Sequence, residues 1–173
     1  MKKQMMKQEV ICLLVEDHYG VLARIASLFG RKGYSIDTLT VSTTTETDLL
    51  RITLTVSGEQ SEIKKIMAQC AKIEEVRSVV LLSVDNSVLR EILLMKLALD
   101  ADKDSQLSQI MEICNIYKAT VVSLTADIMI LELTGKPVKI DAFVDLMQQF
   151  DVMELSRSGA TAMARQKVLG KDE

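Results

Sequence analysis

The segment Glu16-Asp17-His18-Tyr19-Gly20 holds the side chains of this sequence best placed to do chemistry. It separates a run of six apolar residues, which predicts a buried strand, from an amphipathic stretch that predicts a helix. The first amides of a helix and its dipole favour a bound carboxylate in such a loop. Gly20 lets a ligand approach the backbone, and Asp17 or nearby carbonyls can accept a hydrogen bond from an ammonium. The loop therefore fits an amino acid, and the alternative is an ordinary strand-to-helix turn capped by Asp17.

The remaining reactive residues predict no catalytic centre and no metal site. His18 is the only histidine, which excludes a multi-histidine metal site and most histidine-based relays within one chain. No nucleophile or orienting partner stands near it in sequence, so we expect an exposed loop histidine. Residues 30–33 could touch phosphate, but cations followed by glycine are typical of a helix C-terminus. No Walker A, GxSxG or thiamine-type motif is present.

Composition narrows the class of protein. Of the 173 residues, 48% are hydrophobic, which suits a packed core and not a disordered chain. A net charge of -3 and few aromatic rings argue against binding to nucleic acid or to an anionic membrane. No apolar run approaches the roughly 20 residues of a membrane span, and we expect no signal peptide. The scattered cysteines Cys12, Cys70 and Cys114 are typical of reduced, buried thiols, so we expect a cytoplasmic protein.

The first half of the chain predicts the order βαββαβ. Apolar runs and alternation predict strands, and apolar residues at helical spacing predict helices. The expected strands are residues 10–15, 34–44, 51–57 and 76–84, and the expected helices cover residues 21–29 and 63–73.

The same order restarts after the polar joint at residues 85–87. We expect strands at residues 92–99, 119–124, 128–134 and 153–156, helices over residues 107–117 and 140–150, and a loose or helical tail at 159–173. A shift of 77 residues superposes the strand-glycine-helix pattern of the two halves, which indicates two copies of one unit. The sequence thus predicts an α+β protein of two tandem ferredoxin-like βαββαβ domains, residues 1–85 and 86–173.

Each half is small for a self-sufficient domain, at about 80 residues. Two helices cover only one face of a four-stranded sheet. In the first half we expect the bare face to carry residues such as Val15, Leu39 and Val41. A partner must then cover that face, which predicts at least a homodimer.

Several segments resemble a known family. Residues 15–25 and 29–41 resemble the ACT domain of the acetolactate synthase small subunit, and residues 131–143 and 154–159 resemble its C-terminal domain. Arg90-Glu91 and Met95-Lys96 are similar to the opening strand of that second domain. The likeness runs from about Glu9 to Arg165, which is nearly the whole chain.

The resemblance implies a regulatory subunit without a catalytic site of its own. Its partner is a large subunit that carries ThDP, Mg and FAD and condenses pyruvate with a 2-oxo acid toward valine, leucine and isoleucine. The small subunit raises that activity and confers feedback inhibition by valine, bound where two ACT domains meet in a homodimer. The implied effector residues are Asp17, His18, Tyr19, Gly20, Val21, Leu22, Ser35 and Ile36.

Two of these positions depart from the family pattern, which usually has Asn at both. Asp17 only accepts hydrogen bonds at neutral pH and repels a carboxylate, and Ser35 reaches less far than Asn. We therefore expect weak valine binding, or another effector. Two alternatives stay open: a free-standing ACT-type sensor acting on another enzyme, and a small ferredoxin-like phosphate-ester hydrolase. The hydrolase needs a basic first loop, and this loop is acidic.

Overall fold

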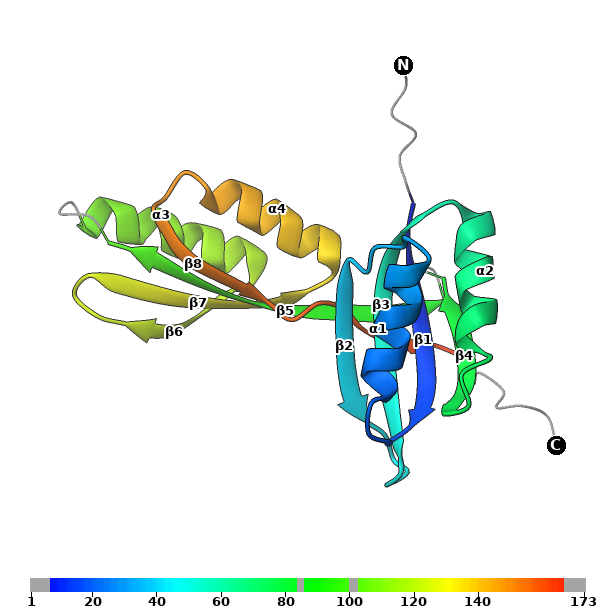
Figure 1. Cartoon of the computed structure of the whole chain (residues 1–173). Coiled ribbons are helices and arrows are strands. Elements are labelled where there is room, and N and C mark those ends of the chain that lie inside the picture. Colours follow the sequence, from blue (N-terminus) through cyan, green and yellow to red (C-terminus); the bar gives the residue numbers. More distant parts are fainter. Residues whose placement is uncertain (1–6, 84–85, 100–102, 167–173) are drawn as a thin grey trace, which may run out of the picture. The chain divides into compact units, whose positions relative to one another are not determined.

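The computed structural model describes residues 7–83, 86–99 and 103–166, and the chain divides into two compact units (Figure 1). The first unit runs to Val88 and takes in the chain from Ala160 onward, and the second is Leu89–Gly159. The domain boundary predicted after residue 85 falls at residues outside the described ranges. None of the described helices is long and apolar enough to cross a membrane.

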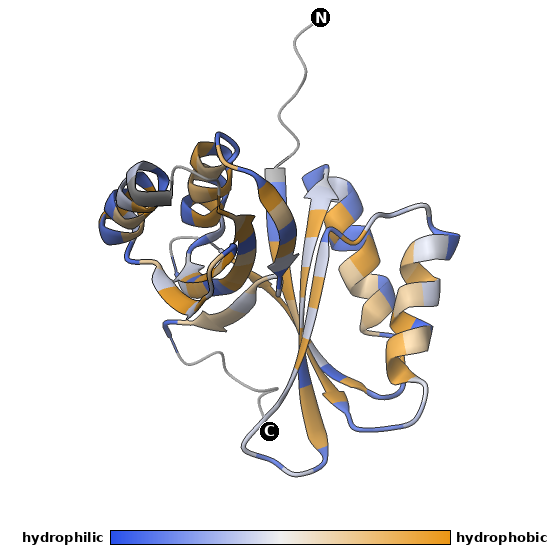
Figure 2. Ribbon diagram, turned by 90° about the vertical axis from the view of Figure 1, so that its left-hand side faces the viewer, coloured by the Kyte–Doolittle hydropathy of each residue, from blue (hydrophilic) through white to orange (hydrophobic). Residues whose placement is uncertain are grey.

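The first unit contains one antiparallel sheet with two helices on one face (Figures 1 and 2). The sheet order is β2-β3-β1-β4, so that β2 and β4 are the edge strands. The elements are β1 (Lys7–Glu16), α1 (Val21–Arg31), β2 (Thr38–Thr43), β3 (Leu49–Gly58), α2 (Gln60–Cys70) and β4 (Val76–Leu82).

The apolar stripe predicted for α1 is its buried face. The side chains of Val21, Ile25, Leu28 and Phe29 are at most 9% exposed and belong to the core between the helices and the sheet. Burial of such a side chain contributes about 1.5–3 kcal/mol relative to leaving it in water. The stripe therefore fixes which side of α1 faces the sheet, and with it the position of the helix N-terminus.

The end of α1 explains why β2 is shorter than the predicted strand. Gly33 has a φ of +72°, and its amide donates to the Gly30 oxygen at 3.1 Å. The Tyr34 amide donates to the Phe29 oxygen at 3.0 Å, which completes a Schellman motif. Residue 34 thus closes the helix instead of opening a strand, and β2 begins at Thr38. The predicted helix C-terminus at residues 31–33 is confirmed.

The second unit repeats the arrangement around a separate core. Its sheet order is β6-β7-β5-β8, and the core includes an edge-on contact between the rings of Tyr117 and Phe143 with centroids 5.3 Å apart. The elements are β5 (Ser87–Ala98), α3 (Lys103–Tyr117), β6 (Thr120–Leu124), β7 (Ile128–Gly135), α4 (Pro137–Met147) and β8 (Val152–Arg157). The predicted fold class, α+β with two tandem ferredoxin-like domains, is confirmed.

The residues predicted for a bare face in the first unit lie on the helix side instead. Val15 is 0% exposed and belongs to the core. Leu39 pairs with Leu54 across β2 and β3, and Val41 pairs with Ile52. Directly paired residues share a face, and both partners are core residues, so the prediction was wrong for all three.

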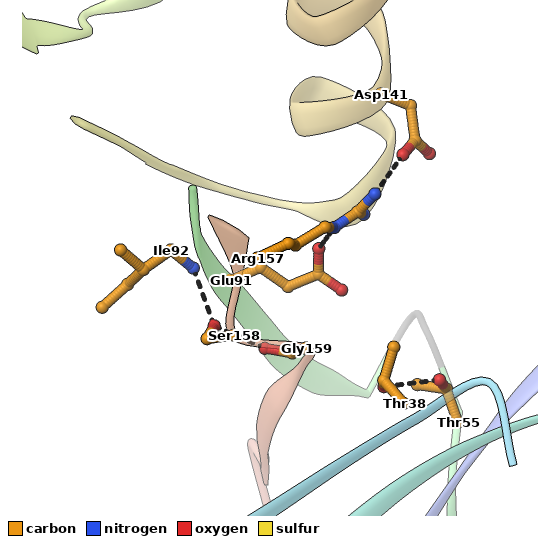
Figure 3. Close-up of polar contacts among 8 residues, drawn as sticks. All are labelled: Thr38, Thr55, Glu91, Ile92, Asp141, Arg157, Ser158 and Gly159. Carbon is orange, nitrogen blue, oxygen red and sulfur yellow. Dashed lines mark hydrogen bonds and ion pairs between the residues drawn. The ribbon is translucent and has the colours of Figure 1, made fainter. Parts of the chain in front are cut away.

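The opposite face carries polar residues together with apolar ones such as Val10 and Leu82, and part of it is buried. Thr53 and Thr55 are each 2% exposed, and Cys12 is 7% exposed. The hydroxyls of Thr38 and Thr55 are hydrogen bonded at 2.6 Å (Figure 3). Thr53, Thr55 and Cys12 are therefore buried in the single chain, without a second copy.

The predicted tail contains a strand that the sequence did not reveal. β9 (Thr161–Ala164) pairs with β5 and contacts β4, and Ala160 and Ala162 are at most 1% exposed. Residues 167–173 of the predicted tail lie outside the described ranges. Alternation of alanine with one threonine and one methionine is too weakly apolar to mark a buried strand. The expectation of a loose or helical tail was therefore wrong for residues 161–164.

Buried thiols predict a loss of stability at alkaline pH. Cys12, Cys70 and Cys114 are free and at most 7% exposed. Burial raises the pKa of all three, that of Cys70 from 9.0 to about 11. A thiol whose pKa is higher in the folded state than in the unfolded state stabilises the fold at pH values below the pKa of the unfolded state. That contribution is lost as the pH rises toward the pKa of the folded state. We expect the melting temperature to fall between pH 9 and pH 11, and to fall less in a Cys70→Ala variant. Equal falls in both proteins would contradict the assignment.

Candidate functional site

The loop between β1 and α1 is held in place by backbone hydrogen bonds. The Asp17 amide donates to the Asp48 oxygen at 2.8 Å, which ties the loop to the turn before β3. The His18 amide donates to the Glu16 oxygen at 2.9 Å, and the Val21 amide donates to the His18 oxygen at 3.2 Å. These bonds fold the chain back on itself between the strand and the helix. The side chains of the loop are thereby left on the surface.

The N-terminus of α1 is not capped by a side chain. Gly20 is the N-cap residue, with a φ of +85°, and no side chain caps the helix. The Arg24 amide makes the first helical bond, to the Gly20 oxygen at 3.0 Å, while the Leu22 and Ala23 amides donate to no group in residues 7–83, 86–99 and 103–166. The capping of this helix by Asp17, which the second alternative assumed, is therefore not found. The arrangement leaves amide donors and the positive end of the helix dipole for an anion.

Leu22, one of these two residues, lines an open surface hollow at the start of α1. Its volume is about 430 Å³, and Tyr19 beside it is 97% exposed. The lining residues are Asp17, His18, Tyr19, Gly20, Val21, Leu22 and Leu50. The hollow thus combines amide donors, one carboxylate and two leucine side chains, which are the groups that bind the carboxylate, ammonium and side chain of an aliphatic amino acid.

Two of the eight predicted effector residues do not line this hollow. Ser35 is exposed and Ile36 is half-buried against the first core, and both lie in the segment between α1 and β2. The structure brings together the six contiguous residues from Asp17 to Leu22 and leaves these two apart. Within one chain the hollow therefore contains six of the eight predicted residues.

Leu50 was not predicted and is supplied by the register of the sheet. Leu50 lies in β3 and pairs directly with Val15 in β1. Val15 is the last residue before Glu16, where β1 ends and the loop begins. The alternation Leu50-Ile52-Leu54 indicates that these side chains share a face. Only the pairing with β1, which the sequence does not specify, places Leu50 beside the loop.

His18 has the surroundings of an exposed loop residue. Its Nδ1 lies 3.1 Å from the Tyr19 backbone oxygen, and its side chain is exposed. No group of three or more potential metal ligands occurs in the part of the chain that the structure describes. The geometry of the hollow thus supports recognition of a small ligand.

The backbone of Gly20 gives a direct test of the loop geometry. A Cβ at this position would meet nothing within 4 Å, so the cost of Gly20→Ala comes only from a left-handed φ of +85°. We expect Gly20→Ala to lower the free energy of unfolding by about 1–2 kcal/mol in urea denaturation. The matched control is Gly30→Ala in α1, where a Cβ also meets nothing within 4 Å and the φ is negative. It should stabilise by up to about 1 kcal/mol, and the same sign for both variants would contradict the geometry.

The fold is that of an ACT-type domain joined to a second ferredoxin-like domain. Comparison with known families agrees with both parts. Residues 11–78 match the family model described as "AHAS small subunit-like ACT domain", and residues 90–166 match "Small subunit of acetolactate synthase".

Relatives along the whole chain carry the same description. The chain is 39% identical over 158 residues to a probable acetolactate synthase small subunit of Archaeoglobus fulgidus, covering 91% of this chain and 97% of that one. It is 37% identical over 155 residues to an acetolactate synthase small subunit of Mycolicibacterium smegmatis, covering 90% and 89%. A crystal structure of the Thermotoga maritima small subunit matches with a TM-score of 0.83 at 31% identity, covering 94% and 99%. The chain belongs to the family of acetolactate synthase small subunits.

Proposed function

We propose that this chain is a regulatory subunit that binds the large catalytic subunit of an acetolactate synthase, raises its activity and makes it sensitive to a branched-chain amino acid such as valine. The free amides of Leu22 and Ala23 at the uncapped start of α1 carry the proposal. They are donors for a carboxylate, beside an apolar wall formed by Leu22 and Leu50. A small aliphatic amino acid presents both groups at once.

We further propose that two copies complete the site. β2 is an edge strand and, among the described elements, pairs only with β3. It contains neither proline nor lysine, the residues that commonly protect an edge from pairing. Pairing of β2 with β2 of a second copy would extend the sheet and bring the segment with Ser35 and Ile36 toward the hollow of the partner. Light scattering tests the dimer, and a monomer at all concentrations would contradict it.

Valine itself is expected to bind weakly. The Asp17 side chain is exposed at the hollow, where its negative charge repels the carboxylate that the helix amides attract. Ser35 offers a shorter donor than Asn at the position contributed by the second copy. Calorimetric titration with valine, leucine and isoleucine tests this, and a micromolar dissociation constant for valine would contradict it.

Catalysis belongs in this proposal to the large subunit. ThDP, Mg and FAD are expected there, and this chain is expected to contribute no catalytic residue. The free, buried cysteines support a cytoplasmic location. The match of residues 90–166 to the family's C-terminal domain favours this role over that of a free-standing sensor.

Regulation follows from linkage between effector binding and subunit arrangement. A ligand held between two copies stabilises one arrangement of the dimer, and the large subunit responds only if it binds the two arrangements differently. Such coupling typically amounts to about 1–3 kcal/mol. Co-elution of the chain with its large subunit on a sizing column tests the association, and separate elution with no change in acetolactate formation would contradict the proposal.

A further inference from the structure

Glu75 contacts both ends of the loop that forms the hollow. Its backbone oxygen accepts a hydrogen bond from the Glu16 amide at 2.8 Å, at the residue where β1 ends. Its side-chain Oε1 pairs with Nη1 of Arg24, in the first turn of α1. Glu75 therefore contacts the chain on both sides of loop residues 17–20, at Glu16 before the loop and at Arg24 after it.

This ion pair is buried on the glutamate side. The Glu75 side chain is 8% exposed, whereas that of Arg24 is 53% exposed. The second carboxylate oxygen, Oε2, is buried and accepts no hydrogen bond from any residue the structure describes. A buried charge is strongly unfavourable unless it is paired. Movement of the first turn of α1 away from Glu75 would leave that charge without the ion pair that compensates its burial.

A second ion pair nearby lacks this property. Arg77 pairs with Glu16 at the same end of the loop, but the two side chains are 62% and 37% exposed. Exposed pairs contribute little to stability, because water solvates both partners when they separate. The two pairs thus give a buried and an exposed version of the same contact beside one loop.

We propose that Glu75 and Arg24 are positioning residues that fix the distance between the end of β1 and the N-terminus of α1. Neither residue lines the hollow. Their contact sets where the amides of Leu22 and Ala23 point, and hence how well those amides meet the carboxylate of a bound amino acid. For its consequence on effector binding, this inference rests on the proposed function.

The test uses the full chain carrying Arg24→Met together with Glu75→Met. The single variant Arg24→Met leaves a buried carboxylate unpaired and is expected to unfold readily, whereas replacing both partners with apolar residues keeps the fold. Hydrogen exchange of the hydrogen-bonded amides of Asp17, His18, Val21 and Arg24 is measured without ligand, and valine affinity is measured by calorimetry. Arg77→Met is the matched control.

We expect the double variant to melt near the wild-type temperature, with these four amides exchanging about tenfold faster and valine binding about tenfold more weakly. The Arg77→Met control should change neither quantity. Unchanged amide exchange in the folded double variant would overturn the positioning role. If the wild-type chain binds no branched-chain amino acid, the proposed function fails, and the exchange data still decide whether the pair positions the loop.

Discussion

Replacing Asp17 with Asn and Ser35 with Asn in one chain is expected to strengthen valine binding by roughly five- to tenfold. The Asp17 carboxylate lies at the hollow with the free amides of α1, where a ligand carboxylate would bind. Two like charges a few ångströms apart in a partly hydrated site repel by about 1 kcal/mol or more. The amide of Asn at position 17 removes the repulsion and adds a donor. Asn at position 35 extends the reach of the residue that the second copy supplies in the proposed dimer.

Calorimetry with valine measures this effect, and a charge-matched variant isolates its cause. Asp145→Asn in the second unit changes the net charge of the chain by the same amount at an exposed position outside the hollow. It should leave valine binding unchanged. Weaker or equal binding by the Asp17→Asn, Ser35→Asn chain would show that the Asp17 carboxylate serves the ligand, for instance by accepting from its ammonium.

The variant Arg157→Met is expected to destabilise the second unit by about 3–5 kcal/mol. Glu91 on β5 is 3% exposed, and its carboxylate is paired with Nε of Arg157 on β8 (Figure 3). Nη1 of Arg157 also donates to Asp141 on α4 at 2.6 Å. Removal of the guanidinium leaves the buried carboxylate of Glu91 unpaired, which is far costlier than the loss of the exposed contact to Asp141. For a unit of this size, the melting temperature should fall by more than about 10 °C.

Two further variants separate the buried contact from the exposed one. Asp141→Asn breaks only the contact with a side chain that is 57% exposed, and should cost less than about 1 kcal/mol. Glu91→Met combined with Arg157→Met removes both buried charges and should recover most of the lost stability. Circular dichroism during heating measures all three. If the melting temperature of Arg157→Met lies within about 3 °C of the wild-type value, the importance of this ion pair is contradicted.

The parts of the site that are contiguous in sequence could be predicted from the sequence. The loop from Asp17 to Gly20 follows a buried strand and precedes an amphipathic helix, so local pattern alone places it at a helix N-terminus. Leu50 is 28 residues beyond Leu22 and reaches the hollow only because β3 pairs with β1 in one register. A shift of one residue would reverse its face, and no local signal fixes that register.

The same reason explains the error over the faces of the first sheet. Val15 ends a continuous apolar run, in which alternation gives no sign of which side chains face the helices. Pairing with Leu50 places it in the core, and Cys12 takes the other face. The return of β9 to β5 was missed for a different reason: alanines at positions 160, 162 and 164 can be buried without the large apolar side chains that reveal a strand.

The most direct test of the regulatory role is acetolactate formation by the cognate large subunit, measured with and without this chain across a titration of valine. We expect the chain to raise the rate, and valine to lower it again only at concentrations higher than those needed with the Asp17→Asn, Ser35→Asn chain. A rate that is the same with and without the chain, at every valine concentration, would contradict the assignment of this chain as the regulatory subunit.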